Sequence, residues 1–137
     1  MSYLIDTNII SEVQKGNHCD PQVAVWWQET PEEDVYLSVL VIGEIRKGIE
    51  LARPQKPQKA AILEQWLEQI EEDFGNRILA VTTDIAEEWG RMGAIRPVST
   101  TDALLAATAK IHGFTLVTRN EADVKDLGVE VFNPFEV

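Results

Sequence analysis

The chain has 137 residues, of which 45% are hydrophobic and 26% are charged, and its formal net charge is −11. This length and composition predict one globular domain over residues 1–137. A cytoplasmic location is expected, because neither a secretory signal nor an apolar run long enough to span a membrane is evident. Cys19 is the only cysteine, which excludes an internal disulfide and a zinc site built from several cysteines.

Strands are predicted to alternate with helices in the first half of the chain. A short buried strand is expected at residues 3–6, followed by a helix that Gly16 and Asn17 end. Asp20-Pro21 is typical of a helix start, with Asp20 as the cap. A strand over residues 35–39 leads into a helix that ends near residue 53. The clearest amphipathic helix covers residues 59–73, with an apolar side made of Ile62, Leu63, Trp66, Leu67 and Ile70.

The second half repeats this alternation. Strands are predicted at residues 79–82, 114–118 and 129–132, and helices at 85–92 and 121–126. A further helix opens at Ser99, with Leu104, Leu105, Thr108 and Ile111 on its inner side, and ends before Gly113. Such alternation implies parallel pairing. We therefore expect an α/β fold with a central, mostly parallel sheet of about five short strands flanked by helices.

Four acidic residues are predicted to meet at one edge of this sheet. Asp6 ends the first strand, Glu44 lies early in the helix after the second, Asp102 falls in the first turn after Ser99, and Asp123 follows the strand 114–118. In a parallel sheet all strand-to-helix junctions lie on the same edge, where open α/β folds bind their ligands. Each acid also has a simpler interpretation, as a helix cap, a solvent-facing residue or a compensation of the helix dipole.

The chemistry of such a cluster favours a metal site. Carboxylates that crowd together raise one another's pKa unless a cation lies among them. Oxygen ligands without His or Cys suit Mg²⁺, with Mn²⁺ as a possible substitute, and such ions assist phosphodiester hydrolysis. A metal site at His18-Cys19-Asp20 is less favoured, because no further soft ligand is near in sequence.

The charge of the chain leaves nucleic-acid binding open. A net negative protein repels phosphates, but one stretch, residues 46–59, contains five basic residues against the acids Glu44 and Glu50 nearby. This stretch is interpreted either as a solvated helical surface or as a local phosphate-contacting patch. Trp26, Trp27, Trp66 and Trp89 occur at helical spacing and favour core positions over RNA stacking, with a subunit interface as a second use of Trp26 or Trp27.

Three stretches taken in order resemble a known family. They are "LIDTNIIS", "VLVIGEIRKGIE" and "STTDALLAATAKIHGFTLVTRN" followed by "EADV". This ordered set resembles the PIN domain, and more narrowly the VapC/FitB-like toxins of type II toxin–antitoxin systems. The resemblance implies that Asp6, Glu44 and Asp102 hold the metal. For the fourth ligand the family pattern is T-x-[DN]-x-x-[DE]-F, which this chain matches at Thr118, Asn120 and Asp123 but not at Val124, where the pattern has Phe. Either Asp123 or Asn120 is therefore expected to supply the last ligand.

The resemblance also implies an activity and partners. It predicts a Mg²⁺-dependent endoribonuclease in which a metal-activated water attacks phosphorus and leaves a 5′-phosphate and a 3′-hydroxyl. Asn8, Thr118 and Asn120 are expected to support the acids. A homodimer is expected, together with an antitoxin protein that places a basic residue in the acidic pocket. Alternatives are a non-toxin PIN nuclease, a catalytically weak PIN-fold interaction module, and a phosphatase with Asp6 as nucleophile, which Asn8 disfavours because that class needs Asp there.

Overall fold

The computed structural model describes residues 1–136, and its five strands form one parallel sheet. The strands are β1 (Tyr3–Ile5), β2 (Val35–Ser38), β3 (Ile78–Leu79), β4 (Thr115–Val117) and β5 (Val131–Phe132). They lie in the order β3-β2-β1-β4-β5, so β1 occupies the centre. Tyr3 is opposite Val35 on one side and Thr115 on the other. The predicted α/β class, parallel pairing and number of strands are confirmed.

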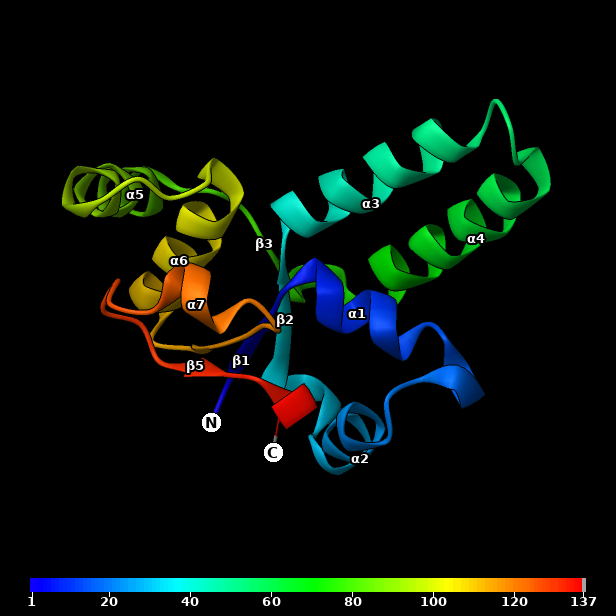
Figure 1. Cartoon of the computed structure of the whole chain (residues 1–137), viewed down its shortest axis with the longest axis horizontal. Helices are drawn as coiled ribbons and strands as arrows, with labels where there is room; N and C mark the ends of the chain where they lie inside the picture. Colours follow the sequence, from blue (N-terminus) through cyan, green and yellow to red (C-terminus); the bar gives the residue numbers. More distant parts are fainter. Residues whose placement is uncertain (137) are drawn as a thin grey trace.

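Seven α-helices surround the sheet in the described part of the chain. They are α1 (Thr7–Val13), α2 (Pro21–Glu29), α3 (Val39–Ala52), α4 (Pro57–Phe74), α5 (Thr83–Ile95), α6 (Thr100–His112) and α7 (Glu121–Val124). Figure 1 shows α5, α6 and α7 on one side of β1 and β2, and α1 to α4 on the other. None of these helices combines the length and the apolar character needed to cross a membrane.

The core lies where strands and helices share apolar side chains. Leu4 and Ile5 of β1, Leu37 of β2 and Val117 of β4 are completely excluded from solvent. Burial of such side chains contributes roughly 1.5–3 kcal/mol each to folding. Helix α6 contacts β1 and β4, and its buried face consists mainly of alanines, whose small side chains allow the helix to approach the sheet closely.

The predicted helix ends are largely confirmed by their capping contacts. Asp20 accepts hydrogen bonds from the N–H groups of Gln22 and Val23, and Ser99 accepts one from Asp102. Gly113 ends α6 in the left-handed region, with φ of 71°, where a residue with a side chain would be strained. The caps satisfy backbone groups that the helix itself leaves unpaired.

Three side-chain placements and one strand differ from the prediction. Ile62 is 62% exposed, Ile111 is 42% exposed and Trp89 is 39% exposed, so none of them takes the buried position expected for it. Ala60 and Phe74 take the buried positions of α4 instead, together with Leu67 and Ile70. Strand β3 has only Ile78 and Leu79, because Thr82 is the N-cap of α5 and accepts a hydrogen bond from Ile85.

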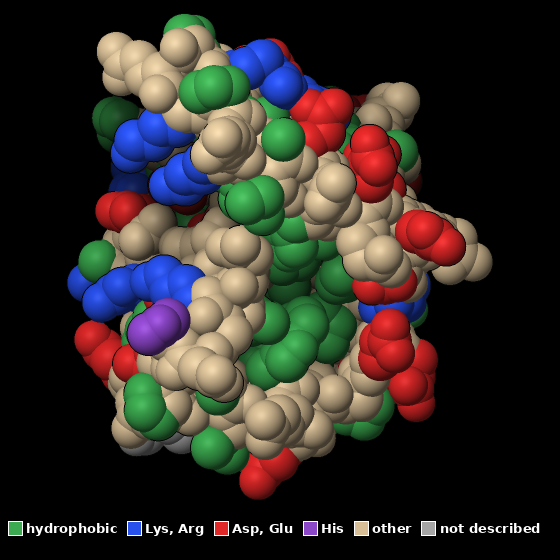
Figure 2. Space-filling view, turned by 90° about the vertical axis from the view of Figure 1, so that its right-hand side faces the viewer, with side chains coloured by type: hydrophobic (Ala, Val, Ile, Leu, Met, Phe, Trp, Pro, Cys, Tyr) green, Lys and Arg blue, Asp and Glu red, His purple; other side chains and the backbone are tan. Residues whose placement is uncertain are grey.

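One hollow of the surface lies between α2 and the end of α4, away from the sheet edge where the acids are predicted to meet. It has a volume of about 310 Å³ and is lined by Trp27, Thr30, Glu32, Val35, Asp73, Phe74 and Arg77. Figure 2, which looks at the right-hand side of Figure 1, shows hydrophobic side chains at the floor of a hollow on that face. Trp27 is therefore half-buried beside a hollow and is not part of the closed core.

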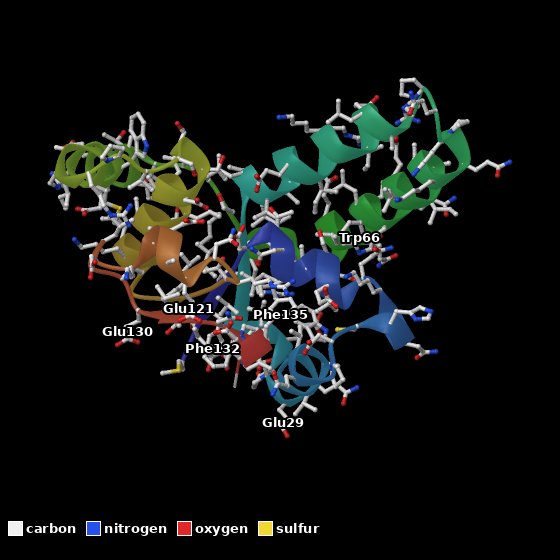
Figure 3. The ribbon with its side chains drawn as sticks, viewed as in Figure 1. Glu29, Trp66, Glu121, Glu130, Phe132 and Phe135 are labelled. Carbon is white, nitrogen blue, oxygen red and sulfur yellow. The ribbon has the colours of Figure 1, made fainter. Side chains whose placement is uncertain are left out.

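The other tryptophan of α2 packs inside the molecule. The ring of Trp26 meets Tyr3 edge-on at 5.4 Å between centroids and lies 6.0 Å from Phe132 of β5. Figure 3 shows Phe132 and Phe135 near α2, at the C-terminal end of the chain. The last turn, Pro134–Glu136, contacts α2 as well. Trp26 thus anchors α2 to the edge of the sheet, as the prediction of a core role requires.

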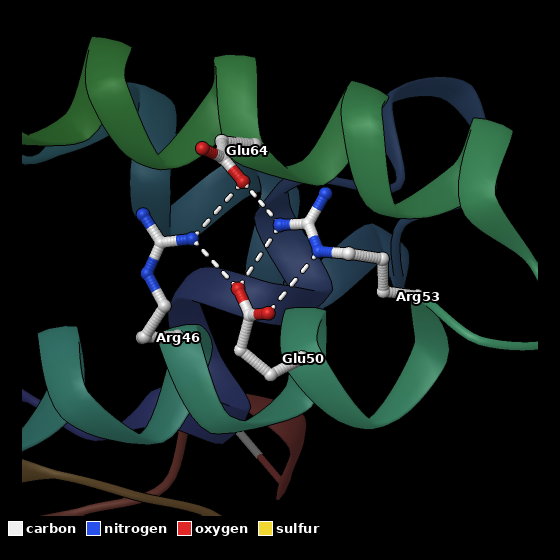
Figure 4. A network of polar contacts seen from close by, with 4 residues as sticks. All are labelled: Arg46, Glu50, Arg53 and Glu64. Atoms are coloured by element: carbon white, nitrogen blue, oxygen red, sulfur yellow. Dashed lines mark hydrogen bonds and ion pairs between the residues drawn. The ribbon is translucent and has the colours of Figure 1, made fainter.

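Two of the five basic residues in the stretch 46–59, Arg46 and Arg53, form ion pairs between α3 and α4 (Figure 4). Arg46 Nη1 donates to Glu50 Oε2 at 3.1 Å and to Glu64 Oε1 at 3.0 Å, and Arg53 contacts the same two carboxylates. These contacts lower the pKa of Glu50 and Glu64, mainly through the hydrogen bonds from Arg53. Arg46 and Arg53 therefore belong to a helical surface with internal pairing, whereas Lys47, Lys56 and Lys59 are exposed.

Candidate metal centre

Asp6 is the most buried acid of the predicted site. It lies between β1 and α1, where its backbone N–H donates to the carbonyl of Val117 at 2.9 Å and keeps the sheet pairing intact. Its Oδ1 accepts a hydrogen bond of 2.6 Å from the N–H of Thr7. Asp6 is therefore both the N-cap of α1 and a carboxylate at the crevice, so the two interpretations of the sequence hold together.

Thr118 and Asn8 fix the second oxygen of Asp6. The hydroxyl of Thr118, a buried residue, donates to Asp6 Oδ2 at 2.8 Å, and Asn8 Nδ2 approaches the same oxygen at 3.4 Å. The Thr118 hydroxyl in turn accepts from the N–H of Asn120 at 3.0 Å. Thr118 is 112 residues from Asp6 in sequence, so the contact joins the ends of β1 and β4.

Burial changes the protonation of Asp6. Desolvation raises the pKa of its carboxyl above the ordinary value of 3.8, and the negative charges of Glu44 and Asp102 add to this effect. The hydrogen bonds from Thr118 and Thr7 oppose it, because they stabilise the ionised form. Asp6 is thus held in one orientation by hydrogen bonds, while burial and the neighbouring acids disfavour its ionised form.

Glu44 reaches the crevice from the second turn of α3. Glu44 is exposed, and its Oε1 accepts a hydrogen bond of 2.6 Å from the hydroxyl of Thr7. Thr7 therefore links two of the acids, since its N–H binds Asp6 and its hydroxyl binds Glu44. Sequence reasoning missed Thr7, although its position directly after Asp6 was a usable signal.

Asp102 comes from the first turn of α6. Its backbone N–H donates to the Ser99 hydroxyl at 3.2 Å, which completes one half of the capping box that the sequence allowed. Within residues 1–136 the Asp102 carboxylate accepts no hydrogen bond from the Ser99 N–H, so this carboxylate remains available to the crevice. Asp102 is half-buried and close enough to raise the pKa of Asp6.

These residues line one hollow of about 440 Å³ at the carboxyl edge of the sheet. The lining consists of Asp6, Thr7, Asn8, Glu44, Ser99, Thr101, Asp102 and Asn120. Asp123 is exposed and is absent from this lining, whereas Asn120 belongs to it. Residue 123 lies near the end of the four-residue α7, whose N-terminal neighbour Asn120 stays next to Thr118. Asn120 is therefore better placed than Asp123 to provide the fourth ligand.

The donor set fits a hard divalent cation. Every side-chain donor that faces the hollow is an oxygen or an amide, and none is a thiol or an imidazole. In the part of the chain that is described, no three Asp, Glu, His or Cys side chains stand close enough to hold one ion as they are arranged. Mg²⁺ commonly keeps several waters and takes only one or two carboxylates directly, so this spacing suits it.

The His18-Cys19-Asp20 segment is not a metal site over the described residues. His18 is exposed, and Cys19 is a free thiol whose Sγ contacts the carbonyl of Asp20. The Asp20 carboxylate is used as the cap of α2. This leaves the crevice around Asp6 as the site that the fold builds from several elements.

The chain has a parallel sheet with acidic side chains at its carboxyl edge, and its similarity to known proteins shows which α/β family it belongs to. The PIN-domain family model matches residues 3–128, so the chain belongs to the PIN-domain family. Toxin FitB of Neisseria gonorrhoeae is 33% identical over 138 residues, which cover 96% of this chain and 97% of that protein. A VapC ribonuclease of Sinorhizobium fredii is 29% identical, covering 97% of both chains.

Solved structures show the same fold. The crystal structure of FitAcB from Neisseria gonorrhoeae superposes with a TM-score of 0.90 at 32% identity, covering 98% of this chain and 99% of that one. A toxin–antitoxin complex from Klebsiella pneumoniae gives a TM-score of 0.76 at 26% identity, covering 99% and 100%. The predicted likeness to the VapC/FitB group is confirmed.

Proposed function

We propose that this PIN-domain protein is a Mg²⁺-dependent endoribonuclease, and that it is the toxin of a type II toxin–antitoxin pair. The observation that carries the proposal is the convergence of Asp6, Glu44 and Asp102 on one hollow from three separate elements. Relatives named as a toxin and as a ribonuclease over nearly the full length support it. Mn²⁺ is the expected substitute ion, because it accepts the same oxygen ligands.

The side chains in the hollow have two roles, binding the cation and orienting the carboxylates. Asp6, Glu44, Asp102 and Asn120 would hold the cation, with Asp123 as the outer candidate for the fourth position. A bound divalent cation supplies charge against the developing negative charge on phosphorus oxygens and makes a water more acidic. Thr118, Asn8 and Thr7 keep the carboxylates of Asp6 and Glu44 in fixed orientations, which preserves the geometry that catalysis requires.

RNA cleavage by the purified protein tests this proposal. Cleavage is expected with Mg²⁺ or Mn²⁺ and is expected to disappear in EDTA and in Asp6→Asn and Asp102→Asn. Ligands of one ion act as a unit, so the double variant should be no worse than either single one. Asp84→Asn is the matched control, because Asp84 is an exposed first-turn acid outside the hollow. Full activity in EDTA would refute the metal requirement.

The alternative of a catalytically weak PIN-fold module is favoured by one feature, the exposure of Asp123 outside the hollow. If the protein binds RNA but cleaves none with either ion, this alternative replaces the nuclease. Activity without growth inhibition on expression would instead indicate a nuclease outside a toxin–antitoxin pair.

We also propose a protein antitoxin that neutralises the hollow with a basic side chain. Without an ion, Asp6 lacks a compensating cation. An arginine inserted among the carboxylates would gain charge-assisted hydrogen bonds and exclude the metal. Replacing that arginine by alanine should restore cleavage while the complex persists. If every basic residue of the partner is dispensable for inhibition, the mechanism is obstruction of RNA access.

A further inference from the structure

Arg119 differs from the other arginines of the described chain. Arg46, Arg53, Arg77, Arg91 and Arg96 all donate to carboxylates or backbone carbonyls. Within residues 1–136 the Arg119 guanidinium donates no hydrogen bond and forms no ion pair. Its one side-chain contact is with the ring of Phe135, at 4.4 Å from the centroid. The donor edge of this exposed residue is therefore unused.

The stacked pair is held by a shared partner. Asn133, which is buried, approaches the carbonyl of Arg119 through Nδ2 at 3.5 Å and accepts the N–H of Phe135 on Oδ1 at 2.9 Å. Phe135 belongs to the last turn, which packs against α2. A ring fixed in this way restricts the guanidinium to one plane, so less freedom is lost when a ligand binds.

The pair also adjoins the acidic hollow. Arg119 lies between Thr118, which binds Asp6, and Asn120, which lines the hollow. Its backbone N–H donates to Asn8 Oδ1 at 3.2 Å, and Asn8 lines the hollow as well. Any movement of residue 119 is therefore tied to the hydrogen-bond network that orients Asp6.

We propose that Arg119, stacked on Phe135, binds a phosphate of the RNA strand beside the one that is cleaved. This inference rests on the proposed ribonuclease function and assigns the RNA a direction across Asn8, from the hollow toward the last turn. A planar guanidinium binds phosphate bidentately, and the stacked ring keeps both donor groups facing outward.

Electrostatics favour a phosphate over a carboxylate partner at this point. The chain carries a net charge of −11, so RNA needs a local cation to approach the acids. Glu12 interacts with Arg119 only weakly, because its pKa is lowered chiefly by the hydrogen bond from Lys15 and Arg119 contributes least. Glu12 is thus already satisfied by Lys15 and the N–H of Asp20, and it leaves the charge of Arg119 available.

The salt dependence of RNA binding tests the proposal. A short single-stranded RNA is titrated against the Asp6→Asn protein, which is expected not to cleave it, over a range of KCl concentrations. Adding Arg119→Ala should weaken binding about tenfold and reduce the slope of log K against log salt by about 0.7, the value for one phosphate contact on a single strand. Arg119→Lys should keep the slope and lose part of the affinity, and Phe135→Leu should do the same.

Lys59→Ala is the matched control, because it removes one positive charge from an exposed site on α4 that lies outside the hollow. It should change neither affinity nor slope. An unchanged slope in Arg119→Ala overturns the inference, and so does a loss of antitoxin binding with RNA binding intact. If the wild-type protein cleaves RNA while Arg119→Ala binds normally, only this inference fails; if the wild type never cleaves, the proposed function fails first.

Discussion

At the scale of single residues, the structure shows how one carboxylate serves two purposes. Asp6 caps α1 through Oδ1 and presents Oδ2 to Thr118 at the crevice. Burial raises its pKa, so folding favours the protonated carboxyl when no cation is present. This stability contribution is complete below the ordinary pKa of 3.8 and is lost as the pH rises through the folded value. At neutral pH the ionised Asp6 therefore lowers the free energy of unfolding, as is common for residues at functional sites.

Asp6→Asn should accordingly leave the metal-free protein at least as stable as the wild type at neutral pH. The amide keeps a side chain of the same shape without the buried charge. Thermal unfolding of both proteins as a function of pH measures this, with the wild type losing stability relative to the variant as the pH rises from the acid range. Added Mg²⁺ should raise the melting temperature of the wild type alone. A strongly destabilised Asp6→Asn protein would contradict the account.

The fourth position should show a graded response. Asn120 lines the hollow and Asp123 does not, so Asp123→Ala should weaken Mn²⁺ binding by less than about tenfold. Asp102→Ala should weaken it by about 100-fold or more, the upper end of the range for residues around a metal. Calorimetric titration separates the two. Equal losses would make Asp123 a full ligand, and no loss at all in Asn120→Ala would remove Asn120 from the site.

At the scale of elements, the features that depend on neighbouring residues in sequence were predictable, whereas those that depend on tertiary contacts were not. The caps Asp20 and Ser99 and the stop at Gly113 act within a few residues, and all were predictable. The exposure of Ile62 was not, because α4 packs through Ala60 and Phe74, and only the position of its neighbours decides this. Likewise the bond between Thr118 and Asp6 depends on strand order, which a single sequence does not specify.

An ion pair between α5 and α6 makes the free energy of unfolding fall at acid pH. Glu88 is buried and accepts hydrogen bonds from Lys110 at 2.9 Å and Arg91 at 3.1 Å, and the former is the chief reason that its pKa is lowered. A lowered folded pKa gives stability above the ordinary value of 4.5, and this is lost as the pH falls through the folded value.

Glu88→Gln should therefore lower the free energy of unfolding by about 1–2 kcal/mol at neutral pH. The difference from wild type should shrink as the pH falls from the ordinary pKa of 4.5 through the lowered folded value, below which the wild-type carboxyl is also neutral. Urea unfolding at neutral and acid pH gives both values. Glu87→Gln is the control, since the Glu87 side chain is exposed and lies 4.0 Å from Arg91. Equal effects of the two variants would refute a special role for Glu88.

At the scale of the whole molecule, the acidic surface and the basic residues beside the site have different ranges of action. We expect the net charge of −11 to attract a basic antitoxin from a distance, whereas the proposed role of Arg119 concerns only a ligand already at the crevice. The fold itself was predicted almost completely from the alternation of strands and helices. The meeting of Asp6 and Glu44 was predictable, because both follow strand ends at one edge of the sheet. Asp102 follows another helix, so its place in the hollow depends on how the start of α6 packs.

We expect the protein to be a homodimer in solution. Trp26 is used within the subunit, but several large apolar side chains elsewhere remain exposed, among them Leu51, Ile95 and Trp89. A symmetric interface would cover part of this surface and place two crevices in one particle. Sedimentation equilibrium at micromolar concentration should give twice the monomer mass of 15.4 kDa. A monomer throughout that range would contradict the expectation.

The bond between Thr118 and Asp6 has a consequence for synthesis of the chain on the ribosome. The carboxylate is made among the first residues, but the hydroxyl that orients it, and the strand β4 that flanks β1, are made near the end. A nascent chain that stops short of residue 118 has the acids Asp6, Glu44 and Asp102 without the scaffold that aligns them. If this hollow is the nuclease site, we expect the chain to be inactive during its own translation and to become active only when β4 completes the sheet.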